Sequence, residues 1–87
     1  MDTVNRAETL DAAREIVCAG RQEEYGGPSF SVIAGFWSVY LGRTIMQHDV
    51  AAMMALLKLA RIRSNPTHHD SWIDLAGYSA CGNEVAR

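Results

Sequence analysis

Residues 49–63 constrain the fold more than any other stretch, because apolar side chains lie on nearly every face of a helix drawn through them. After Asp49, the charges of this stretch are Lys58, Arg61 and Arg63, all within its last two turns. A helix with so little polar surface is buried at the centre of a domain or between subunits. We therefore expect a helix here, with its polar chemistry at its C-terminal end.

Short clusters of glycine and proline divide the rest of the chain into further helices. Asn5 and Glu8 have the spacing of a capping box, which predicts that the first helix begins after Asn5. Gly42 is placed to end the second helix, whose aromatic residues we expect in the core, and Thr67 is placed to cap the last helix. No segment alternates apolar and polar residues as a strand does, so the sequence predicts an all-α fold of four helices. The expected helices cover about residues 6–25, 30–41, 49–63 and 67–85.

Length and charge bound the class of protein. The chain has 87 residues, 48% of them hydrophobic, and a formal net charge of −2. This length predicts one domain over residues 1–87, and such a domain buries only about 60–65% of its unfolded surface, so we expect a homo-oligomer. The charge balance disfavours a nucleic-acid polymer as a partner, and no targeting or membrane-spanning segment is recognisable, which predicts a cytoplasmic protein without a membrane partner. Cys18 and Cys81 match no metal motif, so we expect two reduced thiols in the core.

Asp70 and Asp74 give the strongest local signal for chemistry. They are four residues apart and therefore share one face of the last expected helix, with Tyr78 one turn further on. Carboxylates at this spacing repel each other unless a cation compensates them, and paired carboxylates commonly recruit Mg²⁺ to phosphate chemistry. The alternative is structural: Asp70 serves as a first-turn cap, and Asp74 pairs with Lys58 or Arg61.

Lys58 and Arg61 lie three residues apart and so occupy one side of the preceding helix. If the last two helices form an antiparallel hairpin, both cations come near Asp70 and Asp74. These four groups would form either a salt-bridge network or a phosphate site in which the cations contact oxygens and the carboxylates hold a metal.

A third polar group lies at the expected end of the first helix, where Arg21, Glu24 and Tyr25 are close in sequence. Glu24 falls on the same side of a helix as Arg21. It therefore either faces a site built by the other helices or simply pairs with Arg21.

Several blocks of the sequence resemble a family of small phage and prophage proteins of unassigned function, over about residues 21–82. The most specific blocks are Lys58-x-x-Arg61 and Asp70-x-x-x-Asp74-x-x-x-Tyr78. More distantly, their order is similar to phage domains associated with nucleotide modification and to the MazG-like all-α nucleotide pyrophosphohydrolases. The resembling residues are Tyr25-Gly26, Ile33-Ala34, Trp37-Ser38, Tyr40-Leu41-Gly42, His48-Asp49-Val50-Ala51, Met53-Met54, Lys58-Leu59-Ala60-Arg61-Ile62, Asn65-Pro66, His68, Asp70-Ser71-Trp72 and Asp74-Leu75-Ala76-Gly77-Tyr78.

The resemblance implies an oligomeric, nucleotide-handling protein in the cytosol of a phage-infected or lysogenic bacterium. It implies that Asp70, Asp74 and Glu24 hold Mg²⁺ and are the catalytic groups. The residues implied to bind the nucleotide and its phosphates are Lys58, Arg61, Arg21, Tyr25 and Tyr78. In such an enzyme, water attacks phosphorus and cleaves a nucleoside triphosphate between its α and β phosphates, while the metal offsets the developing charge.

Two functions of other classes remain open on the sequence. One is a binding protein without chemistry, which sequesters a nucleotide and so counters host signalling. The other is a protein–protein adaptor in which the Lys and Asp groups serve only as internal salt bridges.

Overall fold

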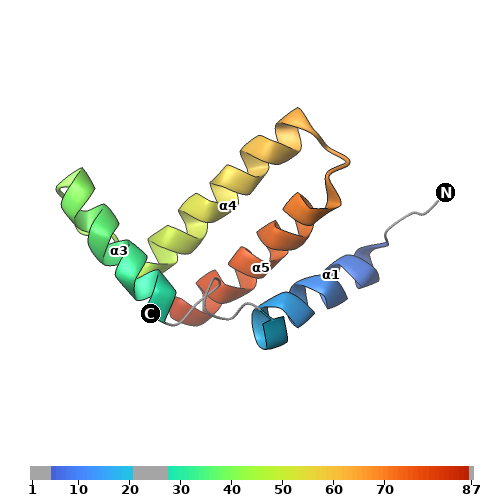
Figure 1. Ribbon diagram of the computed structural model, residues 1–87, viewed down its shortest axis with the longest axis horizontal. Coiled ribbons are helices and arrows are strands. Elements are labelled where there is room, and N and C mark those ends of the chain that lie inside the picture. The colour runs from blue at the N-terminus through green and yellow to red at the C-terminus, as the bar shows by residue number, and fades with distance from the viewer. Residues whose placement is uncertain (1–4, 21–27, 87) are drawn as a thin grey trace.

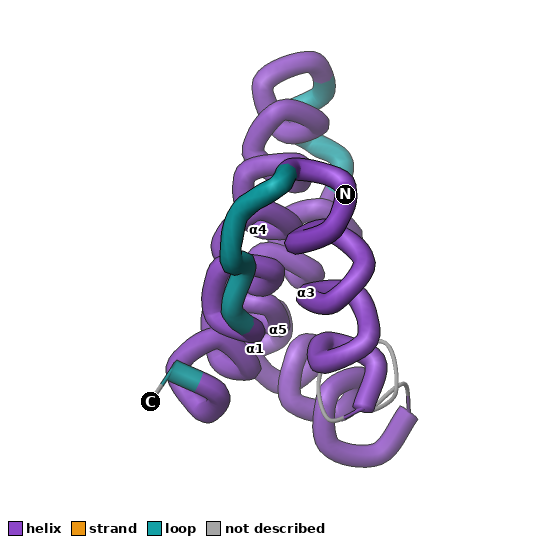
Figure 2. Tube along the Cα trace, turned by 90° about the vertical axis from the view of Figure 1, so that its left-hand side faces the viewer, coloured by secondary structure: helices purple, strands orange, loops and turns teal. Residues whose placement is uncertain are grey.

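The computed structural model describes residues 5–20 and 28–86, which contain helices and no strand (Figures 1 and 2). The expectation of an all-α fold with four helices is confirmed. The helices are α1 (Arg6–Glu15), α3 (Pro28–Leu41), α4 (Gln47–Ser64) and α5 (His69–Val85), and a π-helical segment, η1 (Ile16–Gly20), follows α1 directly.

The start of α1 is the capping box that the sequence predicts. The Asn5 side chain accepts a hydrogen bond from the Glu8 N–H at 2.8 Å, and the Asn5 N–H donates to the Glu8 carboxylate at 3.4 Å. Helical structure continues through η1 to Gly20 in a wider turn. The expected end near Tyr25 lies outside the described residues.

Both boundaries of α3 have a local cause. The helix begins at Pro28, two residues earlier than expected, and proline is well tolerated in a first turn because its fixed φ is helical and its missing N–H is not needed there. It ends at Gly42, as predicted, where the backbone turns left-handed with φ of 69°. The Ser38 hydroxyl then accepts a hydrogen bond from the Ile45 N–H at 2.8 Å, which holds the loop toward α4.

The starts of α4 and α5 differ from the sequence expectation. Helix α4 begins two residues earlier than expected, at Gln47. The Asp49 carboxylate lies in the first turn and accepts a hydrogen bond from the Met46 N–H at 2.9 Å, which caps the start of the helix. The prediction that Thr67 caps α5 was wrong. Its hydroxyl instead donates to the Asn65 side chain at 3.1 Å, and His68 occupies the N-cap position.

Helices α4 and α5 form an antiparallel hairpin, α1 packs along the other side of α5, and α3 crosses the beginning of α4 (Figure 1). The core lies where α3, the first turns of α4 and the second half of α5 meet. Phe30 and Val50 are fully buried there, and the ring of Phe30 stacks on Tyr78 with centroids 6.4 Å apart. The other buried members of this cluster are Ala34, Ala51 and Cys81.

Several side chains expected in the core are exposed. In α4, only Val50, Ala51 and Ile62 are buried, whereas Leu56 and other large apolar side chains face solvent, so burial of this helix at the centre of the domain was a wrong expectation. Its location at a subunit interface remains a prediction. Tyr40 of α3, one of the aromatic residues expected in the core, is also exposed.

The two cysteines are both free thiols, but only Cys81 is buried, so the expectation of two core cysteines was wrong for Cys18. Burial raises the pKa of the Cys81 thiol, and the nearby Glu84 and Cys18 raise it further. Among the described helices, none is long and apolar enough to cross a membrane.

Candidate functional site

The hairpin of α4 and α5 brings one predicted cation and one predicted anion into contact. Lys58 Nζ lies 3.1 Å from Asp74 Oδ2, and the two side chains are 14% and 16% exposed. A mostly buried carboxylate needs a compensating charge, and Lys58 supplies it across the interface of the two helices. This contact is the structural alternative that the sequence left open for Asp74.

Asp70 lies one turn before Asp74 and is exposed in the first turn of α5. There its negative charge is favourable, because the unpaired N–H groups of a helix start carry a partial positive charge. The Lys58 ammonium also lowers the repulsion expected between two carboxylates four residues apart. The two aspartates therefore occupy different surroundings, one at the solvent-exposed helix start and one in the helix interface.

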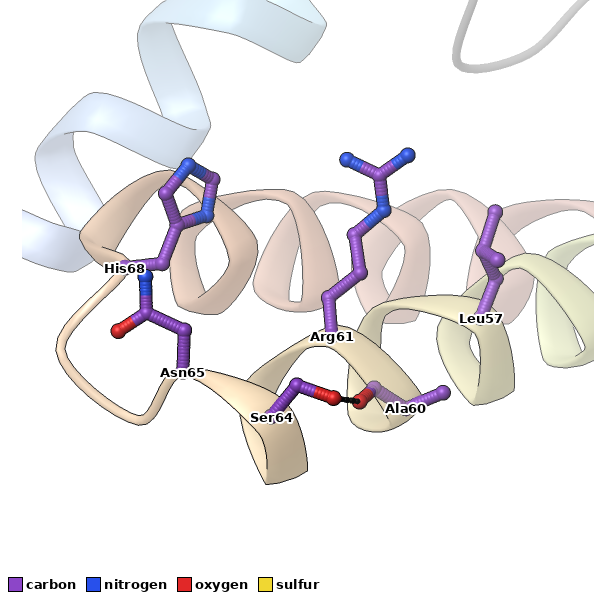
Figure 3. A pocket seen from close by; sticks show the side chains of 6 residues that line it. All are labelled: Leu57, Ala60, Arg61, Ser64, Asn65 and His68. Carbon is purple, nitrogen blue, oxygen red and sulfur yellow. Dashed lines mark hydrogen bonds between the residues drawn. The ribbon is translucent and has the colours of Figure 1, made fainter.

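Arg61 lies apart from this ion pair and lines an open cleft at the turn between α4 and α5. The cleft has a volume of about 460 Å³. Figure 3 shows that the side chains of Arg61 and His68 extend to the same side of the turn, with Leu57 one turn before Arg61. The lining residues are Leu57, Ala60, Arg61, Ser64, Asn65 and His68.

Local hydrogen bonds determine which groups the cleft can offer to a ligand. The Ser64 hydroxyl donates back to the Ala60 carbonyl at 3.4 Å, and the Asn65 side-chain oxygen accepts from Thr67 at 3.1 Å. His68 Nδ1 lies 2.7 Å from the hydroxyl of the buried Ser71. When Nδ1 accepts that hydroxyl proton, the other ring nitrogen carries the imidazole proton and can donate to a ligand. The guanidinium of Arg61 is the only permanent positive charge among the lining residues.

The structure does not bring the remaining described residues of the predicted site together at the Arg61 cleft. Tyr78 is buried against Phe30, two helical turns along α5 from Asp70, so it lies in the core and not at the Arg61 cleft. Arg21, Glu24 and Tyr25 lie outside the described residues. Within residues 5–20 and 28–86, no three His, Cys, Asp or Glu side chains are grouped to hold a metal ion. Of the predicted Mg²⁺ ligands, only Asp70 and Asp74 are described, and Lys58 contacts the second of them.

Sequence reasoning missed the contribution of the turn itself. His68 and Asn65 belong to the short connection between the last two helices, and they line the cleft together with Arg61. Both residues carry the family resemblance, but the signal for a role in the cleft was their position, since side chains of a short hairpin connection lie beside the end of the preceding helix. A second cleft, of about 330 Å³, lies on residues of the same turn and the start of α1, including Arg6 and Trp72.

Comparisons with known proteins place the chain in a family. A family model described as a domain of unknown function, DUF6378, matches residues 8–86, and the chain belongs to this family. It is 39% identical over 78 residues to the Gene 55 protein of Mycobacterium phage D29, a match that covers 87% of this chain and 52% of that protein. It is 40% identical over 73 residues to the Gene 55 protein of Mycobacterium phage L5, which covers 80% of this chain and 47% of that protein. The chain thus spans about half the length of these curated relatives. No solved structure matches.

Proposed function

We propose that this protein is a nucleotide-binding protein of MazG-like type that acts as a homo-oligomer in the cytosol of a phage-infected or lysogenic bacterium. The observation that carries the proposal is the Arg61 cleft: a guanidinium opens on a space of about 460 Å³, beside His68 and Asn65. The neighbouring cation, Lys58, is already compensated by Asp74. Arg61 is therefore the group available to an anionic ligand.

The chemistry of the cleft suits a phosphate group. A guanidinium presents several N–H donors in one plane and matches two phosphate oxygens at once, and a neutral or protonated imidazole adds a further donor. Leu57 and Ala60 continue the same face of α4 and provide an apolar wall against which a base or sugar can lie. Small-molecule sites commonly have volumes of about 300–1,000 Å³, a range that includes this cleft.

Binding without hydrolysis is the form of the function that the ion pair favours. A Mg²⁺ ion held by Asp70 and Asp74 would compete with the Lys58 ammonium for the Asp74 carboxylate. The protein would then sequester a nucleotide, such as a host signalling nucleotide, without turning it over. The Mg²⁺-dependent pyrophosphohydrolase is the other form, and it requires that Glu24 complete a three-carboxylate set with the two aspartates.

Calorimetric titration of the purified chain with ATP, GTP, CTP, UTP and inorganic triphosphate tests the proposal. We expect at least one of these probes to bind, and Arg61→Ala to weaken that binding by about 10- to 100-fold, the value of a charged hydrogen-bonding group. Arg63→Ala is the matched control, because Arg63 is an exposed arginine of the same helix outside the cleft lining. Equal affinity of the Arg61→Ala variant and the wild type would contradict the proposal.

The same samples separate binding from catalysis. With Mg²⁺ present, sequestration predicts binding without release of pyrophosphate, whereas release that is lost in Asp70→Asn would establish the hydrolytic form. If none of the five probes binds, the nucleotide proposal fails and the protein–protein adaptor becomes the better account of the Lys58–Asp74 pair.

A further inference from the structure

Helix α3 has an apolar face that no other residue within 5–20 and 28–86 covers. Its 14 residues include no charged side chain. Four large apolar residues of this face are exposed: Val32 by 55%, Phe36 by 71%, Val39 by 83% and Tyr40 by 88%. Their spacing of four, three and one residues places them on one side of the helix, since each residue advances about 100° around the axis. The side that carries Phe30, Ala34 and Trp37 faces the core instead.

The size of the exposed surface is consistent with a missing subunit. The accessible surface of the chain is 6306 Å². A compact monomer of 9.6 kDa should expose about 5,100 Å², so the excess is roughly 1,200 Å². A stable interface buries about 800 Å² on each partner, which the excess accommodates. The radius of gyration of 13.7 Å likewise exceeds the value of about 12 Å for a compact domain of this length.

In Figure 1, α3 crosses the beginning of α4 at one end of the molecule, while α1 lies on the other side of α5. One side of α3 is thus packed and the other is left to solvent. Monomeric proteins rarely expose large contiguous apolar patches. The chain also has a small core of its own, so burying this face would add substantially to its stability.

We propose that the α3 face of Val32, Phe36, Val39 and Tyr40 is the interface with a second copy of this chain. An uncharged apolar face is self-complementary, because it needs no opposite charge on its partner and can pack on itself about a two-fold axis. The exposed side of α4 is the other apolar candidate, but it carries Arg63 beside Leu56 and Ala60, whereas α3 has no charge to desolvate. This inference does not rest on nucleotide binding.

The test is the mass of the full chain in solution, measured by light scattering after size exclusion at about 50 µM. We expect the wild type at twice the monomer mass of 9.6 kDa, and Phe36→Asp at the monomer mass with an unchanged helical circular-dichroism spectrum. Leu10→Asp is the matched control, because Leu10 is a similarly exposed large apolar residue of α1, and this variant should remain a dimer. Val39→Lys, which places a different charge on the same face, should also be a monomer.

Three results would overturn the proposal. They are a monomeric wild type, a Phe36→Asp variant that stays dimeric, and dissociation caused by Leu56→Asp on α4 but by neither α3 variant. Loss of nucleotide binding in a variant that remains dimeric concerns only the Arg61 cleft, so failure of the two proposals can be told apart.

Discussion

The α4–α5 hairpin and helix α3 differ in the contacts that their side chains make. In the hairpin, a lysine and an aspartate compensate each other across the helix interface at 3.1 Å, and the turn residues hydrogen-bond among themselves. In α3, no charge is present, and five large apolar side chains are exposed: Val32, Phe36, Val39, Tyr40 and Leu41. The hairpin therefore pairs its polar groups within one chain, whereas the exposed face of α3 is uncharged and apolar. The comparison supports both proposals, which place ligand binding at the turn of the hairpin and self-association on α3.

The sharpest contrast within α3 is between its two phenylalanines, and it carries the largest expected effect. Phe30 is fully buried and stacks on Tyr78, whereas Phe36 is exposed. Phe30→Ala should lower the free energy of unfolding by about 3–5 kcal/mol, because it removes a large buried side chain and leaves a cavity. Phe36→Ala should cost less than about 1 kcal/mol in the monomer, measured by urea unfolding at protein concentrations too low for self-association. Equal losses in the two variants would mean that the two sides of α3 do not differ.

In the hairpin, the contact whose removal should have the largest effect on stability is the Lys58–Asp74 ion pair. Lys58→Met should lower the free energy of unfolding by about 2–3 kcal/mol, because it removes the Lys58 ammonium from a mostly buried carboxylate; residual exposure keeps the value below that of a fully buried pair. The double variant Lys58→Met with Asp74→Leu should recover part of this loss, since neither charge then remains. A double-mutant cycle from urea unfolding measures the coupling. A coupling near zero would show that the contact contributes nothing to the hairpin.

Gly42 provides a smaller effect at the end of α3. Its φ of 69° is in the left-handed region, where a side chain is strained, although an added Cβ would meet no atom within 4 Å. Gly42→Ala should therefore cost about 1 kcal/mol from backbone conformation alone, measured by thermal or urea unfolding. Gly35→Ala is the matched control: it also meets no atom within 4 Å, lies inside α3, and should be neutral or stabilising because alanine favours the helix. A larger loss at Gly35 than at Gly42 would contradict this account.

The sequence predicted the helices well because local signals mark them. Asn5 with Glu8 and the glycine at position 42 act through neighbouring backbone groups, so their effects are visible in a short window. The same locality explains the error at Thr67. The Thr67 hydroxyl donates to the side-chain amide oxygen of Asn65, and His68 occupies the N-cap position. Sequence alone cannot rank such alternatives, because Ser, Thr, Asn and Asp side chains can all bond to nearby groups in a turn.

Tertiary placement was harder to predict for a physical reason. The spacing of Lys58 and Asp74 indicated that a hairpin would bring them together, which the structure confirms, but Arg61 points into the cleft of the turn instead of joining them. Helical periodicity also says which residues share a face, and not which face meets the core. In α3, both sides are apolar, so the pattern could not show that Tyr40 would be exposed while Phe30 is buried.

The smallest expected effect concerns how well the core beside α3 is protected from solvent. Cys81 reports on this protection because it belongs to the same buried cluster as Phe30. Its raised pKa, caused first by burial and then by Glu84 and Cys18, means that the folded protein holds this proton more tightly than the unfolded chain. The resulting contribution to stability is fully present below the ordinary thiol pKa of 9.0 and is lost as pH rises through the higher folded value.

At pH 8, a thiol reagent should therefore modify exposed Cys18 quickly and Cys81 only slowly, because the reactive thiolate of Cys81 is both scarce and covered. Mass spectrometry of the labelled protein over time measures the two rates. Phe30→Ala should bring them together and Phe36→Ala should not, and similar rates in the wild type would show that α3 leaves this core open.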